Sequence, residues 1–426
     1  MLERFKSNSG HVGVVGLGYV GLPLSIAFVE AGYRVTGLDI DAEKVALLNR
    51  DETYIRHIGA DAIAKMNASG RFSATTDFAQ SGDVDAIVIC VPTPLKNGRE
   101  PDLGPVLSTG KEIAKYLQKG QLVVLESSTY PGTTDTDLAN VLEVSGLKAN
   151  EDFYLAYSPE REDPGNADFG TSRIPKLVGA DTPEALALSV ALYEDVISEV
   201  IPVSSARAAE AAKLTENTFR AVNIAMVNEL KVIFDKMDID TNEVLAAAAT
   251  KWNFLPFKPG LVGGHCIGVD PYYLAHKASS LGYHPQVILS GRHVNDQMSS
   301  FVSEKIIKLL VKNNFKVQGA KVLLLGVTFK ENCPDIRNSQ AFEIYTALKN
   351  KGVAVFAFDP FANAQEVFDA HQINLVTSLE TYDAIVLTVA HDFFKSLNYA
   401  SLKSSPTSVI YDTKAILDKS IVTARL

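Results

Sequence analysis

Short apolar runs alternate with longer amphipathic segments at both ends of the chain. A run of about four to eight apolar residues between turn residues is typical of a strand that is buried on both faces. The pattern predicts such strands at residues 12–15, 34–38, 86–91, 122–125, 153–157, 321–325, 353–358, 384–389 and 409–411. Because helical patterns separate these strands, both ends of the chain are predicted to form parallel α/β sheets.

The middle of the chain has a helical pattern only. Residues 204–236 carry recurrent apolar positions without glycine or proline, which predicts one long helix. Further helices are predicted at 240–250, 270–281 and 287–311. We therefore predict an α/β fold in which two Rossmann-like, doubly wound domains are joined by a central helical domain with a long spine helix. The predicted domains are residues 1–203, 204–312 and 313–426.

Composition narrows the class of protein. The chain has 426 residues, a hydrophobic fraction of 46% and a net charge of −10, which favour a soluble protein of two or three domains without a general surface for nucleic acids or anionic membranes. The three cysteines, Cys90, Cys266 and Cys333, form neither a metal-binding CxxC spacing nor a disulfide framework, so no metal site is predicted. No signal core and no run near 18 apolar residues is found, so a cytoplasmic location is expected.

A glycine motif follows the first predicted strand. Residues 16–21 read GLGYVG and lead into a helical pattern, and Asp39 ends the next predicted strand, 39 − 21 = 18 residues after the last glycine. This setting is typical of a dinucleotide site, in which the glycines admit the pyrophosphate and the acid accepts from a ribose hydroxyl. A carboxylate at that place favours NAD over NADP. The alternative is a plain turn whose glycines only serve packing.

A second glycine-rich stretch carries a cysteine. In residues 263–270, Cys266 follows two glycines and a histidine, and Asp270 comes four residues later. If these residues are helical, the two side chains share one face, which suits covalent catalysis by the thiol. Taken alone, the cysteine is as readily explained as a small buried apolar residue.

Polar clusters follow three of the predicted strands, at 92–94, 126–134 and 158–165. The carboxyl ends of strands are where doubly wound sheets bind ligands, although each cluster also suits a turn or a helix cap. On the long helix a polar stripe, either solvated or lining a cleft, is formed by Glu210, Lys213, Asn217 and Arg220.

Seven motifs occur in register along the chain. They are GLGYVGLP at 16–23, VPTP at 91–94, STYPGTT at 128–134, SPERxDPG at 158–165, AAKLTENTFRAVNIAMVNE at 211–229, PGLVGGHCIGVDP at 259–271 and GVTFKENCPDIRNS at 326–339. With these motifs the sequence resembles the UDP-glucose/GDP-mannose dehydrogenase family over essentially its whole length. The resemblance implies an N-terminal NAD domain, a central helical domain that forms a homodimer, and a C-terminal nucleotide-sugar domain.

The resemblance also implies a four-electron oxidation of a sugar 6-hydroxyl to a carboxylate by NAD. Cys266 would attack the intermediate aldehyde, and the thiohemiacetal would be oxidised to a thioester that water hydrolyses. Lys213 and Asn217 would stabilise the oxyanion. Asp270 and Thr129 would position the water or share its protons. Glu160 would be the base for thioester hydrolysis.

Binding residues follow from the same motifs. The implied NAD contacts are Gly16, Gly18, Tyr19, Val20, Gly21, Asp39, Thr93, Thr129 and Arg337. The implied UDP-sugar contacts are Glu160, Arg161, Lys213, Asn217, Lys258, Gly260, Gly263 and Lys330, with Lys251 and Arg292 as further candidates.

Two places depart from the glucose-type pattern of the family. They are the residues Arg161, Glu162, Asp163, Pro164, Gly165 and Asn166, and His265 before the cysteine. These are most similar to enzymes that act on UDP-N-acetylhexosamines in bacterial surface polysaccharide synthesis, including O-antigen, and UDP-N-acetyl-D-glucosamine is the expected substrate. UDP-N-acetylgalactosamine, UDP-N-acetylmannosamine and UDP-glucose stay open. So do a two-electron dehydrogenase of the hydroxy-acid type and a non-catalytic nucleotide-sugar-binding protein.

Overall fold

The computed structural model describes residues 1–55, 58–96, 100–161, 173–264 and 266–426, with only the backbone of Cys266. The chain forms two compact units: unit 1 consists of residues 1–216 and 272–283, and unit 2 of residues 217–271 and 284–426. The chain passes between the units at three places: within α8 (Ala206–Lys236), within α10 (Cys266–Ser280) and between Tyr283 and His284. The segment predicted as a central helical domain therefore contributes to both units.

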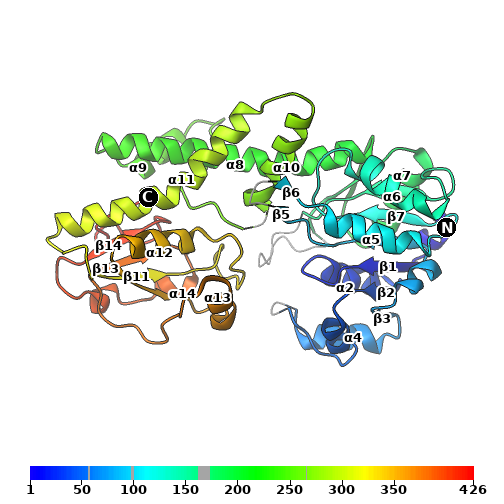
Figure 1. Cartoon of the computed structure of the whole chain (residues 1–426), viewed down its shortest axis with the longest axis horizontal. Helices are drawn as coiled ribbons and strands as arrows, with labels where there is room; N and C mark the ends of the chain where they lie inside the picture. The colour runs from blue at the N-terminus through cyan, green and yellow to red at the C-terminus, as the bar shows by residue number, and fades with distance from the viewer. Residues whose placement is uncertain (56–57, 97–99, 162–172, 265) are drawn as a thin grey trace. The chain divides into compact units, whose positions relative to one another are not determined.

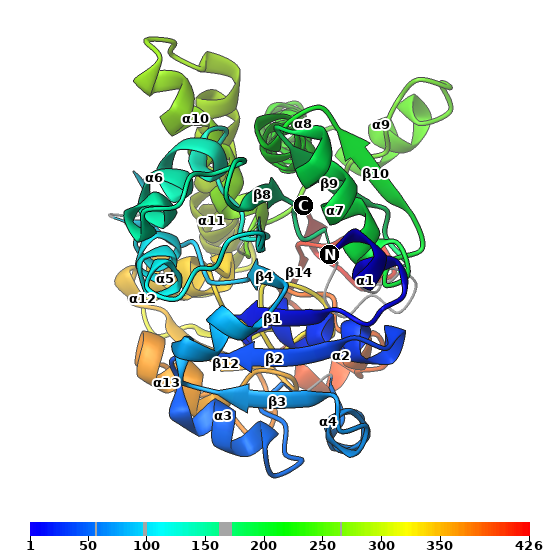
Figure 2. The same cartoon turned by 90° about the vertical axis from the view of Figure 1, so that its right-hand side faces the viewer.

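Unit 1 contains an eight-stranded sheet in the order β10-β9-β8-β7-β4-β1-β2-β3. Figures 1 and 2 show its elements, which are β1 (His11–Val15), α2 (Gly21–Ala31), β2 (Arg34–Leu38), α3 (Ala42–Leu48), α4 (Ala60–Ala68), β3 (Phe72–Thr75), β4 (Ala86–Ile89), α5 (Gly104–Ala114), β7 (Leu122–Leu125), α6 (Ala139–Leu142), β8 (Tyr154–Tyr157), β9 (Lys176–Ala180), α7 (Pro183–Tyr193) and β10 (Val200–Val203). Strands β3, β2, β1, β4, β7 and β8 are parallel, in the classic order of a dinucleotide-binding sheet, and β9 is antiparallel to β8. The predicted Rossmann-like fold of this end is confirmed.

Alternate residues of these strands enter two hydrophobic cores, one on each face of the sheet. In β4, Ala86 and Val88 join the core that includes residues of α2 and α7, whereas Ile87 and Ile89 join the core that includes residues of α5 and α6. Because successive side chains of a strand point to opposite faces, a strand covered on both sides must be apolar throughout. This explains the continuous apolar runs in the sequence.

Unit 2 contains a second parallel sheet, of five strands, in the order β12-β11-β13-β14-β15. Its elements include α9 (Thr241–Ala248), α11 (Gln286–Lys312), β11 (Lys321–Leu325), α12 (Gln340–Asn350), β12 (Ala354–Phe358), α13 (Ala364–His371), β13 (Ala384–Leu387), α14 (Asp392–Lys395), β14 (Val409–Asp412) and β15 (Ala424–Arg425). Val322 and Leu324 pack in a core with α11 and α12, and Leu323 and Leu325 pack in a core with α14. The chain order 2-1-3-4-5 is the other common doubly wound topology.

The helix after the second glycine stretch starts earlier than predicted. We expected a helix at 270–281, but α10 begins at Cys266 and includes Pro271. Proline cannot donate to the carbonyl four residues before it, which here belongs to Ile267. The guanidinium of Arg292, in α11, lies 3.4 Å from that oxygen and donates to it. Arg292 thus replaces the hydrogen bond that Pro271 removes.

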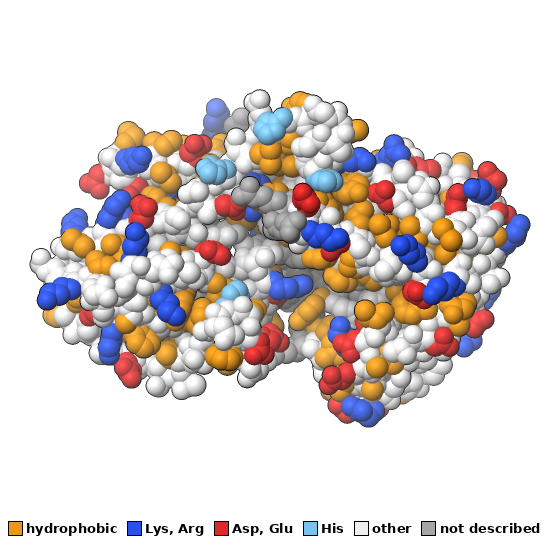
Figure 3. Space-filling view, viewed as in Figure 1, with side chains coloured by type: hydrophobic (Ala, Val, Ile, Leu, Met, Phe, Trp, Pro, Cys, Tyr) orange, Lys and Arg blue, Asp and Glu red, His pale blue; other side chains and the backbone are white. Residues whose placement is uncertain are grey.

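Charges are mixed on the face shown in Figure 3, where basic and acidic side chains are interspersed with apolar ones. Among the described residues, none of the helices is long and apolar enough to cross a membrane.

A buried ion pair ties the antiparallel strand β9 to the parallel part of the unit 1 sheet. Lys176, the first residue of β9, lies 2.9 Å from the carboxylate of Glu126, which follows β7. The exposed fractions of the two side chains are only 5% and 0%. The hydroxyl of Tyr193, in α7, also donates to this carboxylate.

We predict that Lys176→Met lowers the free energy of unfolding by about 3–5 kcal/mol, because it leaves a buried carboxylate without its cation. Chemical denaturation would measure this loss. A matched control is Lys119→Met, which breaks an ion pair with Asp152 in which the lysine is 74% exposed. That change should cost less than about 1 kcal/mol. Equal losses in the two variants would contradict the prediction.

Candidate functional site

The glycine loop after β1 is shaped for a ligand at its centre. Gly16 has φ = +91°, and a Cβ there would lie 2.7 Å from the backbone oxygen of Cys90. A Cβ on Gly21 would lie 1.9 Å from the oxygen of Gly16. Gly18 differs, because a Cβ on it would meet no atom within 4 Å. Two glycines therefore close the turn, and the middle one faces open space, as expected where backbone approaches a pyrophosphate.

Asp39, after β2, holds this loop. The backbone N–H of Leu17 donates to its Oδ2 at 2.8 Å, and that of Asp41 donates to its Oδ1 at 2.9 Å. Each carboxylate oxygen offers about two acceptor positions, so a ribose hydroxyl can still donate to this buried side chain. The hydroxyl of Tyr54 also binds the loop, by donating to the backbone oxygen of Leu17.

The N-terminus of α2 faces the same loop. Val20 is its cap residue, and among the described residues no side chain caps it and none of its first-turn residues is acidic. The N–H of Leu22 already donates to the backbone oxygen of Gly18 at 3.1 Å and Pro23 has no N–H, so an anion would bind the amides before Leu22 at the positive end of the helix dipole. Tyr19 is 44% exposed at the edge of the loop. The residues present fit NAD, with its pyrophosphate at the helix N-terminus.

The loops after β4 and β7 carry two of the predicted contacts. Thr93 is buried, and its backbone oxygen accepts from the hydroxyl of Tyr273 at 2.9 Å. Thr129 is also buried, and its Oγ1 lies 2.5 Å from that of Thr133.

The loop after β8 is held by the long helix. Lys213 is buried, and its ammonium donates to the backbone oxygen of Glu160. Arg161 bonds the backbone oxygen of Pro175 at 2.6 Å and pairs with Glu216 at 2.8 Å. The structure thus brings Glu160 and Lys213 together. The polar stripe is not simply solvated, because Glu210 and Lys213 are buried, whereas Arg220 is exposed.

In unit 2, Asn217 and Asp270 meet directly. The amide nitrogen of Asn217, in α8, donates to Oδ2 of the fully buried Asp270, in α10, at 2.5 Å. Cys266 is the first residue of α10, so the predicted helical spacing of Cys266 and Asp270 is confirmed for the backbone. The side chain of Cys266 lies outside the described residues, as do Glu162, Asp163, Pro164, Gly165, Asn166 and His265.

The segment before the cysteine is fixed at both ends. Asn228 exchanges two hydrogen bonds with the backbone of Gly260, at 2.9 and 3.1 Å. Further along, a Cβ on Gly263 would lie 2.7 Å from the oxygen of Asn338, and one on Gly264 would lie 2.6 Å from the ring of Phe329. Only glycine therefore lets this loop pack against residues 328–339.

The cationic side chains predicted to contact ligands differ in burial and in their partners. Lys251 and Lys258 are exposed, and Lys330 is half-buried. Arg337, which we predicted as an NAD contact, forms bonds of 2.5–3.0 Å to the carboxylate of Asp335. Arg292 is buried and pairs with Asp296 at 2.7 Å.

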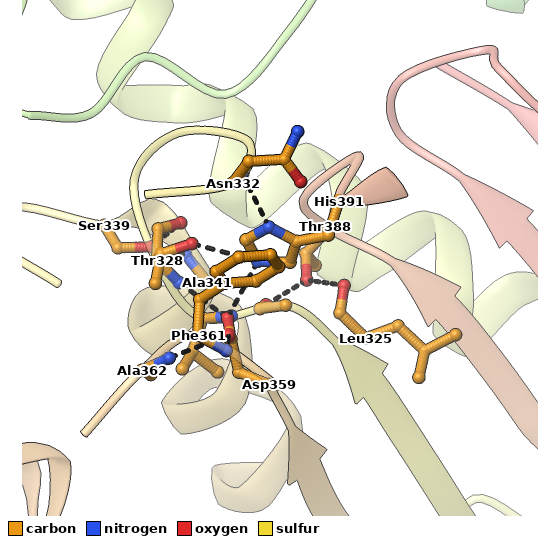
Figure 4. Close-up of polar contacts among 12 residues, drawn as sticks. Leu325, Thr328, Asn332, Ser339, Ala341, Asp359, Phe361, Ala362, Thr388 and His391 are labelled. Atoms are coloured by element: carbon orange, nitrogen blue, oxygen red, sulfur yellow. Dashed lines mark hydrogen bonds and ion pairs between the residues drawn. The ribbon is translucent and has the colours of Figure 1, made fainter. Parts of the chain in front are cut away.

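A buried polar cluster lies at the carboxyl end of the second sheet (Figure 4). Oδ2 of Asp359 accepts from the backbone N–H groups of Val327 at 2.7 Å and Thr328 at 3.1 Å. Nε2 of His391 lies 3.1 Å from the same oxygen, while its Nδ1 accepts from the N–H of Asn332 at 2.9 Å. Since Nδ1 accepts, the ring proton is on Nε2.

Hydrogen bonds outweigh burial in setting the pKa of the Asp359 carboxyl. Burial alone would raise the pKa of this carboxyl, but the bond from His391 and the backbone amides hold that pKa below its ordinary value. The carboxylate and the neutral imidazole together fix residues 327–332, which include Lys330. A small hollow beside the cluster is lined by Leu261, Gly263, Thr328, Phe329, Ser339, Gln340, Ala341, Thr388, Val389 and Lys414.

The sequence placed Glu210 on the polar stripe of the long helix but did not indicate its partners, and it did not indicate Asp359 or His391 as residues of a site. Asp359 follows the second strand of its sheet, as Asp39 does, so its position was a usable signal. His391 follows a buried strand closely and was another.

Comparison with known proteins decides the family. Models described as the NAD binding, central and UDP binding domains of the UDP-glucose/GDP-mannose dehydrogenase family match residues 10–197, 207–297 and 323–419. The chain belongs to this family. The glycine loop lies in the NAD binding domain, and the Asp359 cluster lies in the UDP binding domain. The protein is therefore an NAD-dependent UDP-sugar dehydrogenase.

Individual relatives cover nearly the whole chain. The chain is 44% identical to the UDP-N-acetyl-D-glucosamine 6-dehydrogenase of Pseudomonas aeruginosa, over 96% of this chain and 97% of that protein. It is 40% identical to the enzyme of the same name from Salmonella typhi, over 95% and 96%. The structure of the UDP-D-ManNAc dehydrogenase from Pyrococcus horikoshii is similar with a TM-score of 0.86 and 30% identity, over 97% and 98%.

We predict that His391→Gln weakens UDP binding about tenfold and His391→Asn less than about threefold. The asparagine oxygen can take the place of Nδ1 and accept from Asn332, whereas the glutamine nitrogen can replace only the Nε2 donor. Calorimetry with UDP would measure both variants. NADH binding should not change in either, because the dinucleotide loop lies in unit 1. Equal UDP affinity in the two variants would show that the bond to Asn332 does not position residues 327–332 for UDP binding.

Proposed function

We propose that this enzyme oxidises the 6-hydroxyl of UDP-N-acetyl-D-glucosamine to the uronic acid, through a thioester on Cys266, for bacterial surface polysaccharide synthesis. The observation that carries the choice of sugar is the identity of 44% and 40% to two relatives of that activity. A second candidate, UDP-N-acetylmannosamine, is supported by the structural likeness to the Pyrococcus horikoshii enzyme, although the identity there is only 30%.

Bound NAD would supply the hydride acceptor for both oxidation steps. The first step turns the alcohol into an aldehyde, which has no hydride that leaves easily. Addition of the Cys266 thiol would give a thiohemiacetal, and loss of a hydride from this adduct would give a thioester. Water would then release the acid and restore the thiol.

Polar residues of α8 and α10 support the assigned roles. Lys213 is a buried cation, and Asn217 follows it by four residues on the same helix, so both can stabilise an oxyanion. Asp270 accepts from Asn217 and would hold the attacking water, together with Thr129. Glu160 would take the proton of that water.

We predict two NADH formed for each acid produced from UDP-N-acetyl-D-glucosamine, with a higher kcat/KM than for the galactose, mannose and glucose analogues. Product mass and NADH absorbance against this panel would check both statements. One NADH with an aldehyde or ketone product would exclude the thioester route.

Cys266→Ser should lower steady-state turnover at least about a thousandfold, since the nucleophile is lost.

We also propose a homodimer formed through α8. Phe219, Met226 and Ile233 recur every seven residues on this helix and are 51%, 47% and 45% exposed. A stripe of large apolar side chains at this spacing is typical of a helix that packs against another helix.

We predict that Met226→Glu converts the dimer to a monomer, because it places a charge within the apolar stripe. Light scattering after size-exclusion chromatography would measure the mass. Val311→Glu is the matched control, since Val311 is an isolated apolar residue of α11 that is 58% exposed. A dimer that survives Met226→Glu, or is lost equally in the control, would place the interface elsewhere.

A further inference from the structure

Glu210 is a fully buried carboxylate in the second turn of α8. Its Oε2 accepts from the backbone N–H of Gly132 at 2.7 Å. Its Oε1 accepts from the backbone N–H of Thr134 at 2.9 Å and from the hydroxyl of Thr134 at 2.7 Å. Three donors from the loop after β7 therefore converge on one side chain.

These bonds favour the ionised form of Glu210. A carboxylate accepts all three bonds, whereas a protonated carboxyl cannot: an O–H on Oε2 would face the N–H of Gly132, and an O–H on Oε1 could bond only if the Thr134 hydroxyl turned to accept it. A buried amide with a weaker or missing acceptor is costly, so protonation of Glu210 weakens its hold on residues 132–134.

The loop that Glu210 holds also carries Thr129. The Oγ1 atoms of Thr129 and Thr133 are 2.5 Å apart, and Thr133 lies between the two residues that Glu210 binds. Gly132 has φ = +103°, a left-handed conformation that lets the chain turn just before Thr133. The place of Thr129 thus depends on the Glu210 carboxylate through one intermediate residue.

The same face of α8 fixes the neighbouring loop. Lys213 lies three residues after Glu210, and its ammonium donates to the backbone oxygen of Glu160, which follows β8. Strands β7 and β8 pair in parallel, so their carboxyl ends lie side by side. One helical turn therefore holds both loops, with an anion for the first and a cation for the second.

We propose that Glu210 is a positioning residue, whose carboxylate holds Thr129 in place for turnover and whose protonation releases it. The proposal rests on the role proposed above for Thr129. Glu210 touches neither the sugar nor the cofactor in this role, and acts only through residues 132–134.

Ionisation of Glu210 falls in an accessible pH range. Burial raises the pKa of Glu210 to about 7, and the charge of Asp135 adds to this rise. Asp135 is itself paired with Arg207 at 2.6 Å. Nearby, Lys277 lies 5.1 Å above the ring of Tyr130, the pKa of which burial and Asp137 raise to about 12. Since an acid loses its proton above its pKa, turnover should rise as the pH increases through about 7.

The test compares the wild type with Glu210→Gln, which mimics the protonated acid at every pH. With the UDP-sugar that is turned over fastest, the ratio of wild-type to variant kcat should be near one at about pH 5.5 and about tenfold at about pH 9. A ratio that stays constant over this range would overturn the proposal, because damage that is merely structural has no such pH dependence. Glu229→Gln, which removes an exposed acid from the same helix, should give a ratio near one throughout.

Two further measurements do not depend on the identity of the sugar or on turnover. Hydrogen exchange of residues 128–138 should be faster in Glu210→Gln than in the wild type at about pH 8.5 and equal at about pH 5.5, after correction for intrinsic rates. Exchange that is equal in Glu210→Gln and the wild type at both pH values would overturn the proposal, even in a protein without detectable turnover.

The pH at which the exchange of residues 128–138 changes should rise in Thr134→Val, since this variant removes one donor to the carboxylate. The same midpoint should stay unchanged in Thr134→Ser, which keeps the hydroxyl. A third variant, Thr129→Ala, separates the two roles. If exchange follows this pattern but Thr129→Ala keeps full activity, Glu210 holds the loop, and the proposed role of Thr129 in turnover is rejected.

Discussion

Buried carboxylates that accept backbone amides hold the loops at the carboxyl ends of both sheets. Asp39 does so after β1, Glu210 after β7, Asp359 after β11 and Asp412 after β14. A loop that leaves a buried strand exposes its N–H groups to an apolar environment, and each unpaired amide costs about 1–3 kcal/mol. A carboxylate can satisfy two or more of these groups at once. Ligand-binding loops can thus be both buried and rigid without secondary structure of their own.

The two sheets use this device for different ends. In unit 1 the bonds from Leu17 and Asp41 to Asp39 engage one N–H per oxygen, which leaves acceptor capacity for a ribose hydroxyl. In unit 2 the Asp359 carboxylate is filled, because it accepts from Val327, Thr328, Phe361, Ala362 and His391. A filled carboxylate cannot read a ribose in the same way. The spare acceptor capacity of Asp39 agrees with the GxGxxG motif that precedes it. The filled carboxylate of Asp359 agrees with its place in the UDP binding domain, which has no such motif in the sequence.

The sequence predicted the elements that depend on neighbouring residues alone. Strands 122–125 and 321–325 were located to the residue, because burial on both faces makes the first apolar throughout and the second apolar after Lys321. Strands β9 and β10 were missed, since β9 begins at a lysine, Lys176, and Pro202 interrupts the apolar pattern of β10. Lys176 is compatible with a buried strand only because Glu126, 50 residues earlier, pairs with it. The contacts of Glu210 and His391 were missed for the same reason, as their partners are 78 and 59 residues away.

Helix α10 shows how such long-range compensation sets a local spacing. Cys266 and Asp270 lie one turn apart only if α10 is already helical at its first residue, yet Pro271 removes a hydrogen bond from that turn. Helices with such a proline commonly kink or begin after it. Here the guanidinium of Arg292 donates to the carbonyl of Ile267 that the proline leaves without its amide. The geometry proposed for the thiol and its aspartate is thus maintained by a side chain of α11, which connects the predicted substrate candidate Arg292 to the site through the backbone of Ile267.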